Sequence, residues 1–156
     1  MDVYARLEEL GLKLPPPPPP GGLYKPVKQV RDILYVSGQG ATEGGVPIVV
    51  GKVGAQRTVE EGQQAARICV MNALSVLDHY LGDLNQIKCL VKLQGFVASA
   101  EGFNMQPKVI DGASRLLADI WGEEDGVGAR TAISAIELPG EITVEIEFIF
   151  QLKQEL

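Results

Sequence analysis

The sequence contains few of the side chains that most often carry redox or metal chemistry. Its 156 residues include two cysteines, Cys69 and Cys89, and a single histidine, His79. The cysteines lack the C-x-x-C spacing of redox and zinc sites, and one histidine cannot complete a zinc ligand set. We therefore expect neither a metal nor a redox pair. We also expect free thiols that pack as small hydrophobic residues and suit a reducing compartment.

Basic residues and long apolar runs are also scarce. The chain has 14 Lys and Arg against 20 Asp and Glu, a net charge of −6, and it shows no basic cluster for nonspecific nucleic-acid binding. No window approaches the ~18 uncharged apolar residues of a membrane span, and the N-terminus lacks the order of a secretory signal. These absences predict a soluble, cytoplasmic protein that binds neither membranes nor nucleic acid.

The N-terminal part is set apart by its prolines. Apolar residues at helical spacing within residues 2–12 predict a short helix. Six prolines and two glycines follow at residues 15–22, where the prolines form a stiff polyproline II spacer of roughly 19 Å. This spacer is either a ligand for aromatic-grooved modules such as SH3 domains or a strap that holds the helix against the body. We divide the chain into this segment, residues 1–22, and a domain over residues 23–156.

The domain alternates strand and helix patterns. A capping box of Thr58 and Glu61 begins the first long helix, and Gly82 ends it. The predicted elements are a hairpin over 23–37, an extended piece over 48–54, a helix over 58–82, a strand over 86–99, a helix over 106–122 and a closing hairpin that turns at 138–141. This order indicates an α+β fold in which two long helices pack on one face of a mixed sheet.

The last strand predicts how the two faces of the sheet are covered. Alternate residues point to opposite faces of a strand. The residues expected to face the helices are Ile142, Val144, Ile146, Phe148 and Phe150. Those expected on the other face are Thr143, Glu145, Glu147, Ile149 and Gln151. No element remains to cover that second face, so we expect a closed homo-oligomer.

Arg130 and Glu145 are the candidate site residues. Arginine offers a planar fork that matches a carboxylate, and glutamate can activate water or move a proton, so together they could hold and hydrolyse a small carboxylic acid. The alternative is a surface ion pair or two unrelated solvated residues. In the predicted hairpin Arg130 lies opposite residue 149, ~13 Å along the strand from Glu145. The two side chains would then meet only across a subunit boundary. His79 has no nucleophile or carboxylate at a triad spacing, and we expect it to face solvent.

The stretch "ARTAISAIELPGEITVEIE", residues 129–147, resembles the closing signature of the Rid family, also called YjgF or endoribonuclease L-PSP. "YVSGQG", "TVEEGQQAARICVMNAL" and "IKCLVKLQGFVAS" are similar to further family segments, so that the resemblance covers residues 23–152. The N-terminal segment and the extra residues before the second helix resemble a subgroup of longer members.

The resemblance implies a fold like that of the trimeric chorismate mutases, with ligand sites in clefts between subunits of a homotrimer. It implies hydrolysis of 2-imino or 2-enamino acids to 2-keto acids and ammonia, without a metal or organic cofactor. By position, Arg130 would bind the substrate carboxylate, Glu145 would orient or activate water, and Tyr24 would line the pocket. Glu145 as a plain strand-face carboxylate and Tyr24 as hairpin packing are the alternatives.

Two departures from the family pattern affect the expected pocket. Ala132 stands where many members have cysteine, and either Ile110 or Asp111 replaces an asparagine early in the second helix. An aspartate there would change the charge of the pocket, and with it the substrate preference. A non-catalytic protein that binds a keto acid or similar small carboxylate is therefore the alternative to a deaminase. A ribonuclease, which the older family name implies, finds little support in this acidic sequence.

Overall fold

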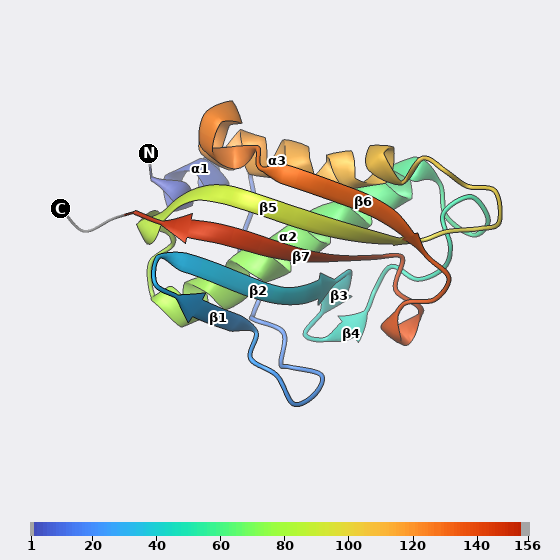
Figure 1. The fold of residues 1–156 in the computed structure, drawn as a ribbon, viewed down its shortest axis with the longest axis horizontal. Coiled ribbons are helices and arrows are strands. Elements are labelled where there is room, and N and C mark those ends of the chain that lie inside the picture. The colour runs from blue at the N-terminus through green and yellow to red at the C-terminus, as the bar shows by residue number, and fades with distance from the viewer. Residues whose placement is uncertain (1, 154–156) are drawn as a thin grey trace.

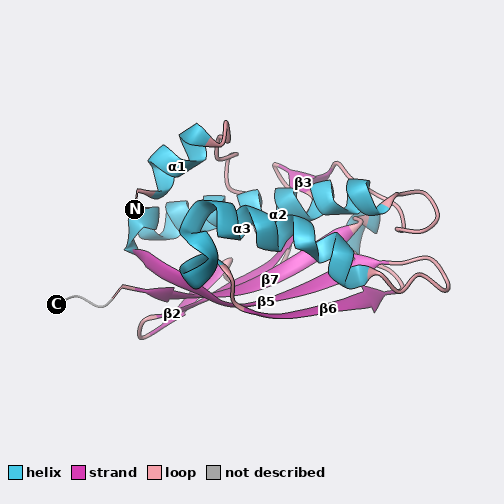
Figure 2. Ribbon diagram, turned by 90° about the horizontal axis from the view of Figure 1, so that it is seen from above, coloured by secondary structure: helices cyan, strands magenta, loops and turns pink. Residues whose placement is uncertain are grey.

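A five-stranded sheet and two long helices form the main layers of the protein (Figures 1 and 2). The computed structural model describes residues 2–153. Its elements are α1 (Val3–Glu9), β1 (Val27–Val30), β2 (Ile33–Gly40), β3 (Thr42–Glu43), β4 (Val46–Pro47), α2 (Val59–Leu81), the 3₁₀ turn η1 (Leu84–Gln86), β5 (Ile87–Ala98), α3 (Gln106–Gly126), β6 (Ala129–Ala135), the 3₁₀ turn η2 (Pro139–Glu141) and β7 (Val144–Leu152). Within residues 2–153 no helix has the length and apolar character needed to cross a membrane.

The sheet is mixed, with the strand order β1-β2-β7-β5-β6. β5 and β6 are parallel and the other neighbours are antiparallel. A parallel pair needs a long crossover, and α3 supplies it between β5 and β6. Figure 2 shows α2 and α3 on one face of the sheet and, among residues 2–153, no helix on the other. The predicted α+β architecture is confirmed, and the segment between the predicted 23–37 hairpin and the 48–54 extended piece contains a small hairpin of β3 and β4.

The predicted closing hairpin is wrong, because β5 lies between β6 and β7. Leu93 of β5 is in register with Arg130 of β6 on one side and with Phe148 of β7 on the other. Arg130 therefore lies opposite Leu93 and not opposite residue 149. β7 carries a row of large apolar side chains, and a central position in the sheet removes most of their surface from water. β6 has mainly small side chains and forms the edge of the sheet.

The helix-facing row of β7 forms the centre of the core, as predicted. Val144, Ile146, Phe148 and Phe150 are all buried, and Glu145 and Glu147 lie on the opposite face. Thr143 was predicted on that opposite face, but it is buried. It precedes β7, and its hydroxyl donates a 2.8 Å hydrogen bond to the carbonyl of Gly51.

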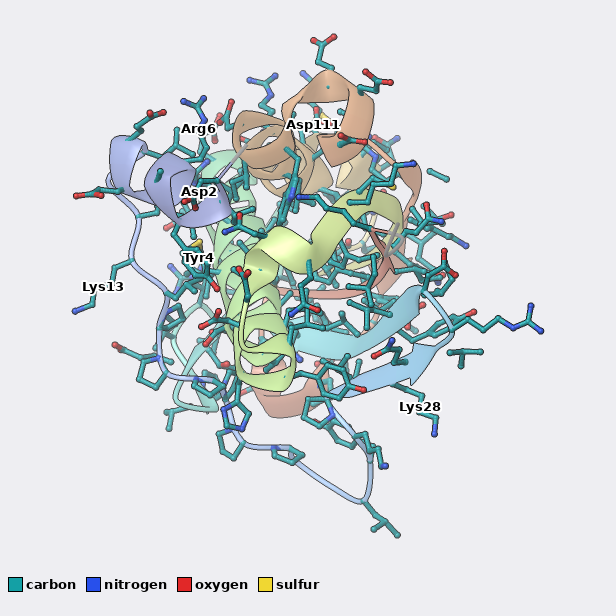
Figure 3. All side chains as sticks on the ribbon, turned by 90° about the vertical axis from the view of Figure 1, so that its left-hand side faces the viewer. Asp2, Tyr4, Arg6, Lys13, Lys28 and Asp111 are labelled. Carbon is teal, nitrogen blue, oxygen red and sulfur yellow. The ribbon has the colours of Figure 1, made fainter. Side chains whose placement is uncertain are left out.

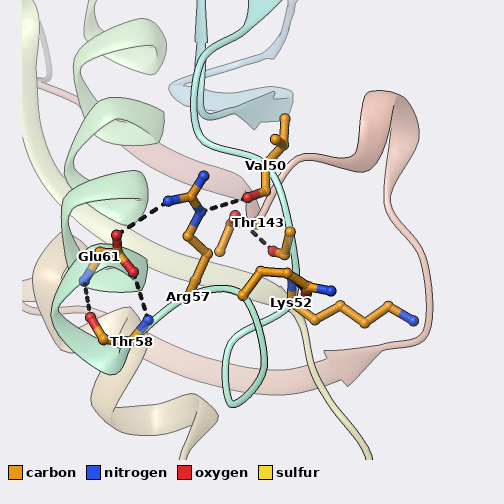
Figure 4. A network of polar contacts seen from close by, with 8 residues as sticks. Val50, Lys52, Arg57, Thr58, Glu61 and Thr143 are labelled. Carbon is orange, nitrogen blue, oxygen red and sulfur yellow. Dashed lines mark hydrogen bonds and ion pairs between the residues drawn. The ribbon is translucent and has the colours of Figure 1, made fainter.

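The predicted capping box begins α2. The Thr58 hydroxyl accepts a hydrogen bond from the Glu61 N–H at 3.1 Å, and the Glu61 carboxylate accepts one from the Thr58 N–H at 2.8 Å. Arg57 forms an ion pair with Glu61, and its Nε donates a hydrogen bond to the Val50 carbonyl at 2.6 Å (Figure 4). These contacts connect the start of α2 to the segment that contains Val50. Gly82, with a φ of 75°, ends the helix in the left-handed conformation that glycine adopts freely.

The N-terminal helix packs on the helix layer. Val3 and Leu7 are buried and belong to the main core. Figure 3 shows Arg6 directed from α1 toward α3, where its Nε donates a 2.7 Å hydrogen bond to the Asp119 carbonyl. The proline segment, residues 15–22, is called the strap below. It also contacts the helix layer, because Ser75 of α2 donates a hydrogen bond to the Pro15 carbonyl. The division into residues 1–22 and 23–156 stays a prediction.

Candidate functional site

A cavity of about 580 Å³ lies where the end of the strap meets β2 and the small hairpin. Its walls include Pro18, Pro20, Tyr24, Gly38 and Glu145. The structure thus brings two of the three predicted site residues, Tyr24 and Glu145, to one cavity. The strap itself contributes walls, which the sequence did not reveal. The assignment of this cavity as a substrate pocket stays a prediction.

Tyr24 is placed at this cavity by the turn that follows the prolines. Tyr24 is 48% exposed, and its hydroxyl accepts a 3.0 Å hydrogen bond from the Gly21 N–H. This bond closes the Gly21–Tyr24 turn on itself. The hydroxyl therefore lies beside the strap and is not buried within the β1–β2 hairpin.

Glu145 points to the sheet face opposite to α2 and α3. Its neighbours across the sheet are Gly40 of β2 and Phe96 of β5. The β2 register shifts between Val36 and Gln39, and a Cβ at Gly38 in this bulge would overlap the Glu145 carboxyl. Glycine in a strand marks such a close approach, and "SGQG" was the signal from which Gly38 could have been found.

The surroundings of Glu145 make it an unusual carboxyl. Burial raises the pKa of Glu145, and the nearby Glu147 carboxylate raises it further. No residue among 2–153 forms a hydrogen bond or ion pair with the Glu145 side chain. A half-buried carboxyl without a partner can give up or accept a proton closer to neutral pH than an exposed one.

Arg130, the third predicted site residue, does not line this cavity. From the edge strand β6 its Nη1 donates to Asp111 Oδ1 at 2.7 Å and to Ser114 Oγ at 3.2 Å, and both partners belong to α3. The side chains of Arg130 and Asp111 are 28% and 35% exposed. The guanidinium therefore lies on the helix side of the sheet, with part of its surface open to solvent.

Arg130 and Glu145 do not meet within one chain. They lie on opposite faces of the sheet, two strands apart and three residues out of register. This spacing corresponds to about 14 Å between their Cα atoms. A site that uses both side chains therefore needs two copies of the chain, and the cross-subunit hypothesis stays a prediction.

The two residues that could take the place of the expected asparagine have different surroundings. Ile110 is buried and packs on Gly95 of β5, whereas Asp111 pairs with Arg130. Ala132, two residues after Arg130, is partly buried against the core. Ser114, one helical turn after Asp111, was not identified from the sequence, because its role depends on where the edge strand lies.

The other predicted positions agree with the sequence analysis. His79 is exposed on α2, Cys69 is buried and Cys89 is partly buried, and both cysteines are free. Burial raises the pKa of the Cys69 thiol, and its Sγ lies 3.4 Å from the Val144 carbonyl. Cys69 is thus a small core residue and not a nucleophile.

The mixed sheet with two long helices on one face defines a small α+β protein of the chorismate-mutase-like class. The family described as "YjgF/chorismate_mutase-like, putative endoribonuclease" matches residues 4–142, and the chain belongs to this family. The expected resemblance to the Rid and YjgF proteins is therefore confirmed.

Similar proteins share nearly the whole length of the chain. Protein TCP17 of Trypanosoma cruzi is 39% identical over 96% of this chain and 94% of its own. The solved structure of Atu1372 from Agrobacterium tumefaciens, a protein of unknown function, is 40% identical, covers 97% and 94% of the two chains, and has a TM-score of 0.87. A "putative endoribonuclease" from Shewanella oneidensis is 32% identical, covers 97% and 100%, and has a TM-score of 0.92.

Proposed function

We propose that the protein hydrolyses reactive 2-imino and 2-enamino acids to 2-keto acids and ammonia, in clefts between the subunits of a cytoplasmic homotrimer. The observation that carries this proposal is the half-buried Glu145 carboxyl, which has a raised pKa and faces the strap cavity. General acid–base catalysis is most efficient when the pKa of the group lies near the working pH. Membership of the YjgF family and the resemblance to Rid deaminases support the reaction class.

Glu145 has a consistent role in each proton transfer. A 2-enamino acid first takes a proton at C3 from the Glu145 acid, which gives the iminium ion and leaves Glu145 as a carboxylate. The Glu145 carboxylate then accepts a proton from water as the water oxygen bonds to C2. Return of that proton to nitrogen makes the amino group a leaving group. Ammonia departs as the new C2 hydroxyl gives its proton to the Glu145 carboxylate and becomes the keto oxygen. The Glu145 acid is thereby restored, and the reaction consumes one water.

Arg130 of a neighbouring copy is proposed as the carboxylate clamp for this reaction. Within residues 2–153 its Nε and Nη2 have no hydrogen-bond partner, so one edge of the guanidinium fork is free for a bidentate carboxylate. Imines already hydrolyse in water, and fixing the substrate beside one positioned water and one acid can supply a large acceleration.

The bare sheet face supports the homotrimer. Tyr35 of β2 and Ile133 of β6 are 47% and 42% exposed, and Phe96 lies between their strands on the same face. Apolar residues gathered on one face with no covering layer are typical of a surface buried by association. A ring of three copies would cover this face and place β6 of one copy near the cavity of the next.

Non-catalytic binding of a keto acid or similar small carboxylate is the second candidate function. It is favoured by the separation of Arg130 and Glu145, since Arg130 alone suffices to bind an anion. The ribonuclease named in the family description has no comparable support, because the chain carries a net charge of −6.

The test is to generate 2-aminoacrylate with a serine or threonine dehydratase and to measure keto acid formation against a trapping amine. Wild type should accelerate the reaction, and Arg130→Ala and Glu145→Gln should abolish the acceleration. Arg115→Ala is the matched control, because it removes an exposed arginine from α3. If wild type gives no acceleration, the deaminase is excluded, and pyruvate should then raise the melting temperature of wild type but not of Arg130→Ala.

A further inference from the structure

Only part of the Arg130 guanidinium forms hydrogen bonds within the part of its own chain that the structure describes. Asp111 Oδ1 and Ser114 Oγ both contact Nη1. Within residues 2–153 neither the Nε–Nη2 edge of Arg130 nor Asp111 Oδ2 has a hydrogen-bond partner. A ligand that approaches the free donor edge of the arginine therefore also meets a free acceptor of the aspartate.

The packing of α3 fixes this acceptor. Ile110 is buried against Gly95, and Gly112 lies so close to Gln63 of α2 that a Cβ there would overlap the Gln63 backbone. The helix cannot rotate Asp111 away from Arg130 without losing both contacts. Asp111 is thus a preorganised part of the arginine site.

Charge and hydrogen bonding then favour one kind of ligand. The Arg130–Asp111 pair has no net charge, so a plain carboxylate gains from Arg130 and is repelled by Asp111. A ligand with an N–H group on the carbon next to its carboxylate satisfies both residues. Because the two side chains are only 28% and 35% exposed, these interactions are stronger than they would be in bulk water.

We propose that Asp111 is a specificity-determining residue, which makes the Arg130 site select carboxylates that carry an N–H-bearing nitrogen on the adjacent carbon over those that carry a carbonyl there. This inference rests on the proposed function, in which the substrate has that nitrogen and the keto acid product lacks it. The product carbonyl oxygen is an acceptor and faces the acceptor Oδ2. Asp111 therefore also favours product release.

The experiment compares two ligands of the same carbon skeleton, alanine and pyruvate, by NMR titration of the full chain. Wild type should bind alanine about tenfold or more tightly than pyruvate, as expected for one hydrogen bond to a charged group. Asp111→Asn keeps the shape but supplies an amide donor to the carbonyl, and should lower this ratio about tenfold. Asp119→Asn removes the same charge from an exposed position of α3 and should leave the ratio unchanged.

The possible outcomes distinguish the specificity role of Asp111 from the carboxylate-binding role of Arg130. If both ligands require Arg130 but Asp111→Asn leaves their ratio unchanged, the specificity role is overturned and the clamp stands. A ratio that changes in Asp111→Asn, with both ligands lost in Arg130→Ala, supports the inference. If wild type binds neither ligand, or if Arg130→Ala binds them as wild type does, the clamp fails and the inference fails with it. A melting curve for each variant checks that it is folded.

Discussion

The Glu145 carboxyl occupies the space that a side chain at Gly38 would fill. A Cβ added at Gly38 would overlap Glu145 Oε1, and the β2 bulge at this point lets the two strands come so close. This relationship explains how a carboxyl on an uncovered sheet face becomes half-buried. It also makes Gly38 part of the proposed site without any functional group of its own.

We predict that Gly38→Ala lowers keto acid formation by about 10- to 100-fold, because displacing a catalytic group by about 1 Å has an effect of this size. The fold should tolerate the change, since Gly38 does not have a left-handed φ and the overlapping atom is the end of a flexible side chain. The dehydratase-coupled assay and a melting curve measure the two effects. Wild-type activity in Gly38→Ala would mean that the position of Glu145 is unimportant.

Gly112→Ala is the matched control for this substitution. Its Cβ would overlap the Gln63 backbone between α2 and α3, which cannot move as freely as a glutamate side chain. We therefore expect this variant to lose about 1–3 kcal/mol of unfolding free energy. Gly38→Ala should lose activity without losing stability, whereas Gly112→Ala should lose stability.

The raised pKa of Glu145 predicts a pH-dependent cost in stability. Burial and the Glu147 carboxylate favour the protonated form in the folded state, so the folded pKa lies above the unfolded pKa. Below the unfolded value, about 4.3, both states are protonated and the cost is absent. As pH rises through the folded pKa the cost becomes complete.

Glu145→Gln should therefore be more stable than wild type at neutral pH and equally stable near pH 3.5, in urea unfolding series. Glu147→Gln removes the repulsion while keeping Glu145, and should give a smaller gain at neutral pH. If the stability advantage of Glu145→Gln over wild type grew as the pH fell, burial and the Glu147 carboxylate could not be the cause of the raised Glu145 pKa.

Leu7 is predicted to tie the N-terminal segment to the fold. It is 3% exposed and lies in the main core, so Leu7→Ala should cost about 2–5 kcal/mol of unfolding free energy. Glu8→Ala changes an exposed neighbour and should stay within about 0.5 kcal/mol of wild type. Equal stability of Leu7→Ala and wild type would favour the interpretation of the proline segment as a ligand for another protein.

The sequence predicted the local features of this fold better than the neighbours of each strand. The capping box at Thr58, the glycine stop at Gly82 and the buried alternation of β7 depend on residues close together in the chain. The place of β6 depends on β5, which lies more than thirty residues earlier. The turn residues "LPGE" indicated a hairpin, but no local signal could show that another strand separates its two arms.

The candidate site was predictable to a similar extent. Side-chain chemistry led to the prediction of Arg130 and Glu145 as site residues, and the family resemblance added Tyr24. The extra residues before the second helix left open whether Ile110 or Asp111 replaces the family asparagine. Only packing distinguishes these two, because the side chain buried against Gly95 cannot also reach Arg130.

The uncovered sheet face should be the surface through which the trimer forms. Tyr35→Glu places a charge beside Ile149 on this face and should convert trimers into monomers in sedimentation measurements. Tyr80→Glu is the control, because Tyr80 is 48% exposed on α2 in the helix layer. Trimers that persist in Tyr35→Glu and dissociate in Tyr80→Glu would place the interface on the helices.

Two inactive variants should restore activity when they assemble together. If each site uses Arg130 of one copy and Glu145 of the next, Arg130→Ala and Glu145→Gln chains can form intact sites in mixed trimers. Random assembly of equal amounts in a ring should give about a quarter of the wild-type sites. The measurement is the coupled assay on chains unfolded and refolded together, with each variant refolded alone as the control. Mixed samples without activity would show that the two residues do not share a site, because an arginine and a glutamate of the same chain are too far apart to act together.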